Sequence, residues 1–215
     1  MKKILFMCCL VVASSVLAFA QSDYKKAEFY VGYSNNQADT GVDSGNSVQS
    51  FFRDRESFNG FQTSGVYNVH RYVGIKGDIS GTYKNQSVNS PFTVGNTTGN
   101  VRFDSNRSVY NFLGGVQIKD NSSDARVKPF AHALVGAGHA RYKVKNAVCT
   151  GGITTCPTFI GNVTETGLAG AFGGGIDIKV SDRVDIRAIQ VDYNPIKFDG
   201  GTTNNVRFGI GLVFK

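Results

Sequence analysis

Long apolar runs, cysteines and histidines are all scarce in this sequence of 215 residues. Beyond residue 20, no apolar run approaches the roughly 20 residues that a membrane-spanning helix needs, and apolar residues do not recur at helical spacing. Lysine and arginine are scattered, without the basic stripe and interleaved aromatics that indicate a nucleic-acid surface. These absences argue against a helical membrane protein and against nucleic acid as a partner.

The first twenty residues have the pattern of a secretory signal peptide. Lys2 and Lys3 precede an apolar stretch from Ile4 to Val16, and Ala18-Phe19-Ala20 offers the small-x-small site that signal peptidase cleaves. A membrane anchor is the alternative, but the stretch is short for a span and ends in a cleavage site. We therefore predict a signal peptide over residues 1–20 and one exported domain over residues 21–215.

Two cysteines follow the leader, Cys149 and Cys156, in a segment rich in glycine and threonine. An exported chain meets oxidising conditions, which favour a disulfide between them. A metal site is the alternative, but no further His, Cys, Asp or Glu lies between the two. The sequence thus predicts one short-loop disulfide, and neither a metal nor a cofactor.

What the mature region does contain is alternation. Apolar residues alternate with polar residues or glycine in eight blocks of about ten residues, and loops rich in Asn, Ser, Thr, Gly and Asp separate the blocks. In the clearest block, Val73, Ile75 and Ile79 share one face, while Lys76 and Asp78 share the other. Such alternation is typical of membrane β-barrel strands. The blocks cover residues 27–34, 60–69, 73–83, 110–118, 127–141, 168–178, 184–194 and 206–214.

Eight is an even number of strands, as a closed antiparallel barrel with both termini on one side requires. Ten residues at about 3.3 Å each, tilted near 40°, rise roughly 25 Å, which matches the apolar band of such barrels. Because every backbone group must be paired in lipid, closure of the sheet leaves no edge strand. We therefore predict an all-β fold: a transmembrane, antiparallel, up-and-down β-barrel of eight strands.

The connections between blocks set the expected orientation. Those after the second and sixth blocks are short, at residues 69–71 and 180–183, whereas those after the first, third and fifth are long and polar. With the N-terminus in the periplasm, the long loops all emerge outside the cell. The same threading brings a set of aromatic residues to one rim, where the bilayer meets water: Tyr33, Phe61, Tyr83, Tyr110 and Tyr193.

Two blocks are ambiguous because neither of their faces is clearly polar. In the seventh block we expect Ile189, Val191 and Tyr193 to face lipid, and Gln190 and Asp192 to face inward. In the fifth block we expect the small-residue face to look at lipid: Ala131, Ala133, Val135 and Ala137.

The interior of an eight-stranded barrel is only wide enough to be filled by side chains. We expect a mixed set of charges to pair inside it, because buried charges cost free energy unless they are paired. In this plugged lumen, Lys76 is expected to be the nearest cation to the inward carboxylates. A conductive path is one alternative; a soluble, lipocalin-like barrel with an apolar interior is another. The expected interior charges are Lys76, Asp78, Asp177, Asp192 and Arg207.

The last block carries the most specific motif. Residues 207–214 resemble the terminal signal of bacterial outer-membrane barrels, with Arg207, Gly209, Leu212 and Phe214 at its characteristic positions. Lys215 departs from this pattern, in which the aromatic residue usually comes last. Across nearly all of the mature region, the layout resembles the small barrels of the OmpA/OmpX type. The resemblance implies a location in the outer membrane and docking of the signal on the barrel assembly machinery.

No catalytic constellation is visible. His132 and His139 belong to one block but to opposite faces, and neither has a serine two residues away or a neighbouring carboxylate. His70 falls in a tight turn. Residues 173–175 are three glycines, but a strand pattern follows them, whereas a phosphate-binding loop needs a helix.

The expected function is therefore a non-enzymatic outer-membrane barrel whose long loops serve envelope integrity, surface recognition or adhesion. A narrow diffusion pore and a lipid-modifying enzyme are the alternatives. Loss of Lys2 and Lys3 with the leader lowers the basic residues from 23 to 21, against 16 acidic ones. This balance suits the anionic sugars and phosphates of lipopolysaccharide. Expected partners are outer-membrane lipid, lipopolysaccharide and the barrel assembly machinery, and the barrel is expected to be a monomer.

Overall fold

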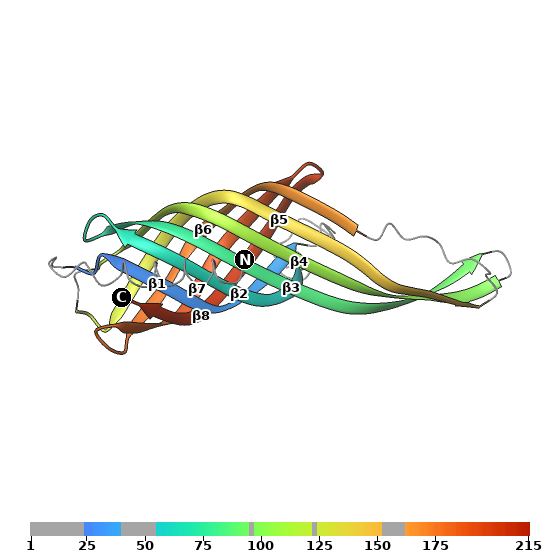
Figure 1. Cartoon of the computed structure of the whole chain (residues 1–215), viewed down its shortest axis with the longest axis horizontal. Helices are drawn as coiled ribbons and strands as arrows, with labels where there is room; N and C mark the ends of the chain where they lie inside the picture. Colours follow the sequence, from blue (N-terminus) through green and yellow to red (C-terminus); the bar gives the residue numbers. More distant parts are fainter. Residues whose placement is uncertain (1–23, 40–54, 95–96, 122–123, 152–161) are drawn as a thin grey trace, which may run out of the picture.

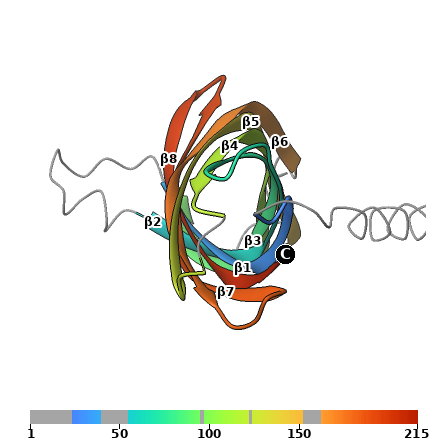
Figure 2. The same ribbon diagram turned by 90° about the vertical axis from the view of Figure 1, so that its left-hand side faces the viewer.

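The computed structural model describes residues 24–39, 55–94, 97–121, 124–151 and 162–215, so the expected signal peptide lies outside it. In these ranges the chain forms eight strands: β1 (Ala27–Asp39), β2 (Arg55–Asn68), β3 (Val73–Val94), β4 (Thr97–Lys119), β5 (Val127–Gly151), β6 (Asn162–Lys179), β7 (Val184–Phe198) and β8 (Gly201–Phe214). Each strand pairs antiparallel with its neighbours in the sequence, and β8 pairs with β1, which closes the barrel (Figures 1 and 2). The predicted fold class is confirmed. Among the described residues, no helix is long and apolar enough to cross a membrane.

Alternate residues of each strand lie on the outer wall and in the lumen. On β3, Val73, Ile75 and Ile79 are exposed on the outer wall, whereas Lys76 and Asp78 are buried inside. The two ambiguous blocks follow the expected faces. On β5 the outward residues are Ala131, Ala133, Val135 and Ala137, and on β7 they are Ile189, Val191 and Tyr193.

Aromatic residues gather on the outer wall near the end where β1 and β2 are joined. Tyr33 donates a hydrogen bond to Asn59 at 2.5 Å, and Tyr193 donates one to Asn204 at 2.6 Å. Tyr83 and Tyr110 meet edge to face, with ring centroids 5.6 Å apart. The hydroxyls of Tyr33 and Tyr193 are thus hydrogen-bonded beside an apolar wall, as expected where a bilayer meets water.

Three strands run far beyond the others, and here the expectation of a long loop after the third block is wrong. β3 and β4 stay paired from Val73–Ile118 to Val94–Thr97, and β5 pairs with β4 as far as Gly151. Figure 1 shows this part projecting from one end of the barrel. We call residues 84–94, 97–109 and 139–151 the extended sheet. Its strands lack the alternating signal because polar residues lie on both of their faces.

The opposite end of the barrel carries short connections, as expected. Residues 69–72 join β2 to β3, and residues 180–183 join β6 to β7. At the other end, Asp199 and Gly200 alone join β7 to β8, and Gly201 has a φ of 147°, which residues with a Cβ rarely adopt. The long loops after the first and fifth blocks, residues 40–54 and 152–161, lie outside the described residues.

Candidate functional site: the barrel interior and the extended sheet

Arg207 of β8 is the centre of a buried ion network. Its guanidinium lies 2.8 Å from Asp78 Oδ1 of β3 and 2.7 Å from Asp192 Oδ2 of β7. Gln62 donates a hydrogen bond to Asp78 at 2.6 Å, and Gln190 donates one to Asp192 at 2.7 Å. Each carboxylate therefore has a cation and an amide donor, which offsets the cost of removing it from water.

A second network continues from the first. Arg187 donates to Gln190 Oε1 at 2.8 Å and to Asp177 Oδ1 at 2.8 Å. Lys119 lies 3.0 Å from Asp177 and 2.7 Å from Glu28. Because Gln190 contacts both arginine networks, the chain of hydrogen bonds crosses the interior without a break.

Aromatic rings hold the Arg187 guanidinium from two sides. Its central carbon lies 4.4 Å from the centroid of Tyr30 and 4.0 Å from that of Phe130. Cation–π contacts of this kind are strongest where water is excluded, and the side chain of Arg187 is buried. The lumen is thus filled by packed rings as well as by ion pairs.

The structure places all five expected interior charges inside the barrel, but Lys76 differs in its partners. Its Nζ lies 3.2 Å from His132 Nδ1 and 5.6 Å from the Phe130 ring centroid. On the other side of the imidazole, His132 Nε2 lies 2.9 Å from Asp192 Oδ1. The expectation that Lys76 is the nearest cation to the carboxylates is therefore wrong, since arginines occupy that position.

Sequence reasoning left out several interior charges: Glu28, Lys119, Asp185 and Arg187. Strict alternation assigns Glu28 and Lys119 to inward faces, so pattern alone could have found them. Arg187 could not be found in this way, because a β-bulge lies between it and Gln190. Ala188 and Ile189 together oppose Ile210 of β8, and the extra residue turns Arg187 to the inner face.

An apolar cluster fills the β4–β7 side of the lumen, which the sequence analysis did not predict. Its buried members are Leu113, Leu134, Ala169, Ala171 and Ile196, with Val109 and Phe198 packed against them. The cluster and the two arginine networks together leave the lumen occupied by side chains.

The residues of the terminal motif lie on both faces of β8. Arg207 is buried inside, Gly209 faces inward beside Gln62, and Leu212 and Phe214 are exposed on the outer wall. Lys215, the departure from the family pattern, is buried at its side chain and donates to Asp185 Oδ1 at 2.6 Å. The role of the motif in assembly stays a prediction.

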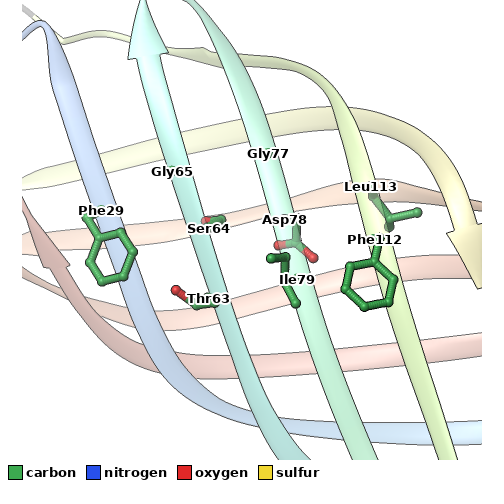
Figure 3. A pocket seen from close by; sticks show the side chains of 9 residues that line it. All are labelled: Phe29, Thr63, Ser64, Gly65, Gly77, Asp78, Ile79, Phe112 and Leu113. Carbon is green, nitrogen blue, oxygen red and sulfur yellow. The ribbon is translucent and has the colours of Figure 1, made fainter. Parts of the chain in front are cut away.

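The outer wall has a depression of about 480 Å³ over β1–β4 (Figure 3). Gly65 and Gly77 face each other across β2 and β3, and a Cβ at either position would meet no atom within 4 Å. Exposed Phe29, Ile79 and Phe112 surround them. The depression therefore opens outward and is not part of an internal channel.

The outward face of the extended sheet carries two adjoining polar grooves. One, of about 410 Å³, is lined by Asn85, Gln86, Ser87, Asp104, Asn106, Lys145 and Asn146. The other, of about 570 Å³, is lined by Asn89, Asn100, Arg102, Asp104, Asn146, Val148 and Thr150. Asp104 and Asn146 belong to both grooves and so form the wall between them.

That wall is held by local hydrogen bonds. Ser87 Oγ donates to Asp104 Oδ1 at 2.7 Å, and Asn146 Nδ2 donates to Asp104 Oδ2 at 2.7 Å. The two bonds hold the pKa of Asp104 below its ordinary value. Asn146 has a φ of 54°, and the pairing of β4 with β5 shifts register beside it. A bulge therefore sets the position of this side chain.

The remaining candidate residues, the cysteines and two of the histidines, form no cluster of reactive groups among the described residues. Cys149 lies on β5 opposite Val101, while Cys156 is outside the described residues, so the disulfide stays a prediction. His139 contacts Thr166 at 2.8 Å, and His70 lies in the turn before β3. In the part of the chain that the structure describes, no three His, Cys, Asp or Glu side chains are grouped to hold a metal.

The barrel geometry agrees with a sequence comparison. The profile of the outer membrane protein beta-barrel domain family matches residues 6–214. The chain belongs to this family. This outer-membrane barrel is accordingly a protein of the bacterial outer membrane.

Solved structures similar to this outer-membrane barrel include Ail, the attachment invasion locus protein of Yersinia pestis, in complex with the heparin analogue sucrose octasulfate. Ail is 17% identical, the match covers 88% of this chain and 98% of Ail, and the TM-score is 0.52. Neisserial surface protein A is 11% identical, with 88% and 96% covered and a TM-score of 0.49. At 17% identity, the match to Ail shows the fold alone. No curated protein sequence matches the chain.

Proposed function

We propose that this outer-membrane barrel is non-enzymatic and serves surface recognition or adhesion through its extended sheet. The observation that carries the proposal is the contrast between a filled interior and a three-stranded sheet that projects beyond the barrel (Figure 1). A projecting sheet with polar faces and grooves offers a partner far more surface than the lumen does.

The proposal requires the extended sheet to lie outside the cell. This orientation follows if the short connections, including residues 180–183, face the periplasm, as in barrels of this kind. Epitope tags near Gly45, Asn96 and Gly152 should then be accessible on intact cells, whereas a tag near Asp182 should not. Surface labelling at Asp182 without permeabilisation would overturn the orientation.

The filled interior argues against a diffusion pore. The Arg187 and Arg207 networks and the apolar cluster occupy it, and their side chains are buried. We expect the refolded barrel to show no steady conductance in a planar bilayer. A steady, large conductance would favour the pore.

The histidines do not support an enzyme that modifies lipid. His132 is enclosed between Lys76 and Asp192 in the lumen, away from the outer wall where lipid would lie. His139 is partly exposed near the membrane rim, but its contacts are with Thr166 and the Tyr110 ring. Unchanged lipid A masses on expression are the expected result.

Partners follow from the location and the charge. We propose outer-membrane lipid and lipopolysaccharide around the wall, docking of the terminal motif on the barrel assembly machinery, and a monomeric barrel. That Ail was crystallised with a heparin analogue supports the idea that a barrel of this fold can present a surface for acidic saccharides.

The test is a barrel with a shortened sheet. Gln86 and Ser105 are paired across β3 and β4, so residues 87–104 can be replaced by an Asn-Gly turn, which suits a two-residue hairpin. Folding is checked by heat-modifiable mobility on gels. Cells with the wild-type barrel should adhere to a matrix-coated surface more than cells with the shortened barrel. Equal adhesion, with altered permeability to antibiotics, would favour a role in envelope integrity instead.

A further inference from the structure

We propose that the outward face of the extended sheet binds an acidic oligosaccharide, with sugar hydroxyls in its two grooves and acidic groups on a row of cations along β5. The proposal rests on the surface-recognition function and specifies its ligand class.

The first support is that all the residues concerned share one face. On the paired strands, Ser87 lies opposite Asp104, and Asp104 lies opposite Lys145. Residues two apart on a strand point to the same side. The face therefore collects the two grooves and the alternate β5 residues that continue them: Arg141, Lys143 and Lys145.

The grooves are lined by groups that suit sugar hydroxyls. Their walls are mostly amides and hydroxyls, each able to donate and to accept hydrogen bonds, together with the Asp104 carboxylate. Val148, which is 56% exposed, supplies an apolar surface for the C–H face of a sugar ring. A protein-binding site would instead be expected to present a buried aromatic or aliphatic anchor pocket.

The wall between the grooves is already ordered. Asp104 accepts hydrogen bonds from Ser87 and Asn146 at 2.7 Å each, so its carboxylate is fixed before any ligand arrives. A preorganised group loses less conformational freedom on binding. The hydrogen-bonded Asp104 and Asn146 thus act as a fixed divider, with space for a ligand on either side.

The charge of this face selects an acidic ligand. Arg102, Arg141, Lys143 and Lys145 give it four cations against the single carboxylate of Asp104. Lys143 and Lys145 are two residues apart, or about 7 Å along the strand, so one extended chain can meet both. Opposite charge steers such a polymer to the face and orients it along β5.

The experiment measures binding of saccharides to the purified, folded barrel in detergent micelles. The probes are a size-defined heparin oligosaccharide, the same oligosaccharide after desulfation, and polyglutamate as a polyanion without sugar. The phosphorylated core oligosaccharide of lipopolysaccharide is the fourth probe. Binding of heparin or of the phosphorylated core supports the proposal, and their relative affinities identify the source of the ligand.

Two variants separate charge from sugar recognition. Lys143→Gln with Lys145→Gln should weaken heparin binding about tenfold or more, because charge-assisted contacts are lost. Asn146→Gly with Asn100→Ala should weaken heparin binding severalfold and leave polyglutamate binding unchanged, since glycine keeps the φ of 54°. The matched control is Lys197→Gln, an exposed lysine on β7 outside both grooves, which should bind as the wild type does.

Two results would contradict saccharide binding by the extended sheet. The proposal is overturned if the wild-type barrel binds none of the acidic saccharides. It is also overturned if it binds polyglutamate as tightly as heparin and the amide variant changes neither. Adhesion that depends on the extended sheet, without saccharide binding, would leave the recognition function standing and remove this inference alone.

Discussion

Replacing Arg207 by methionine should destabilise the barrel strongly. The change removes the cation that Asp78 and Asp192 share, together with a hydrogen bond to Ser80 Oγ at 2.9 Å. Both carboxylates would stay buried, each with an amide donor from Gln62 or Gln190 but without its arginine. Removing one partner of a buried ion pair costs about 3–5 kcal/mol, and we expect a loss in that range.

Lys76→Met is the matched comparison, because it removes a buried basic side chain of similar length. Lys76 contacts His132 and the Phe130 ring, and no described carboxylate lies within salt-bridge distance of its Nζ. The loss should be near that of one ordinary hydrogen bond, about 1 kcal/mol. The structure thus predicts a large difference between two substitutions that both remove one buried basic side chain.

Unfolding in urea, followed in detergent micelles by far-UV circular dichroism, measures both losses. The chain has no tryptophan, so fluorescence is a poor probe. A third variant, Arg207→Met with Asp78→Asn and Asp192→Asn, removes the stranded charges and should recover part of the lost stability. The reasoning is refuted if Arg207→Met costs no more than Lys76→Met. It is also refuted if the triple variant is no more stable than Arg207→Met alone.

The remaining predictions concern assembly, the loop and the wall. Phe214→Ala should lower the yield of folded, heat-modifiable barrel in the outer membrane more than Phe208→Ala, which removes a similar outward ring of β8; equal yields would count against the terminal signal. If Cys149 is bonded to Cys156, closing so short a loop removes about 2–3 kcal/mol of unfolded-state entropy in the chain-entropy model, yet Cys149→Ser should leave the barrel folded. Labelling of two free thiols in the denatured, unreduced mature protein would disprove the bond. Gly60→Ala should lower stability by about 1–3 kcal/mol, since its Cβ would strike the backbone oxygen of Gly81. Gly77→Ala, which has open space around it, should be neutral or slightly stabilising, and equal losses from the two glycines would contradict the packing.

Much of the barrel could be predicted from sequence because its two faces meet different surroundings. Ile75 and Ile79 lie on the outer wall, which faces lipid, while Lys76 and Asp78 lie in a packed polar lumen. Apolar and polar residues therefore alternate along the sequence of the strand. Even the alanine face of β5 follows this rule.

The pairing of interior charges could not be predicted in the same way. Arg207 and Asp78 are 129 positions apart, and which cation meets which acid depends on the stagger of the strands around the ring. The bulge at Ala188 and Ile189 is a second obstacle. It reverses the alternation within β7, so a strict period of two assigns Arg187 to the wrong face.

The strands of the extended sheet could not be predicted because their two faces do not differ in polarity. Residues such as Asn85, Ser87 and Asn89 lie on its outward face, and Lys84 and Gln86 lie between them on the other. With polar residues on both sides, the strand has the composition of a loop. Only its backbone pairing distinguishes such a strand from a loop, and backbone pairing does not appear in the hydropathy pattern of the sequence.

The pairing of β1 with β8, from Phe29–Phe214 to Gln37–Val206, has a consequence for how the ring forms. All other neighbouring strands of the ring are consecutive in the sequence, whereas this pair joins the first and the last strand of the barrel. Non-local pairings form slowly because a long loop must close before they contribute stability. Until β8 is in place, β1 presents an unpaired edge, which lipid does not tolerate. Of the eight strands, β1 is synthesised first and β8 last, so the pairing edge of β1 must stay covered until β8 has been made and has paired with it.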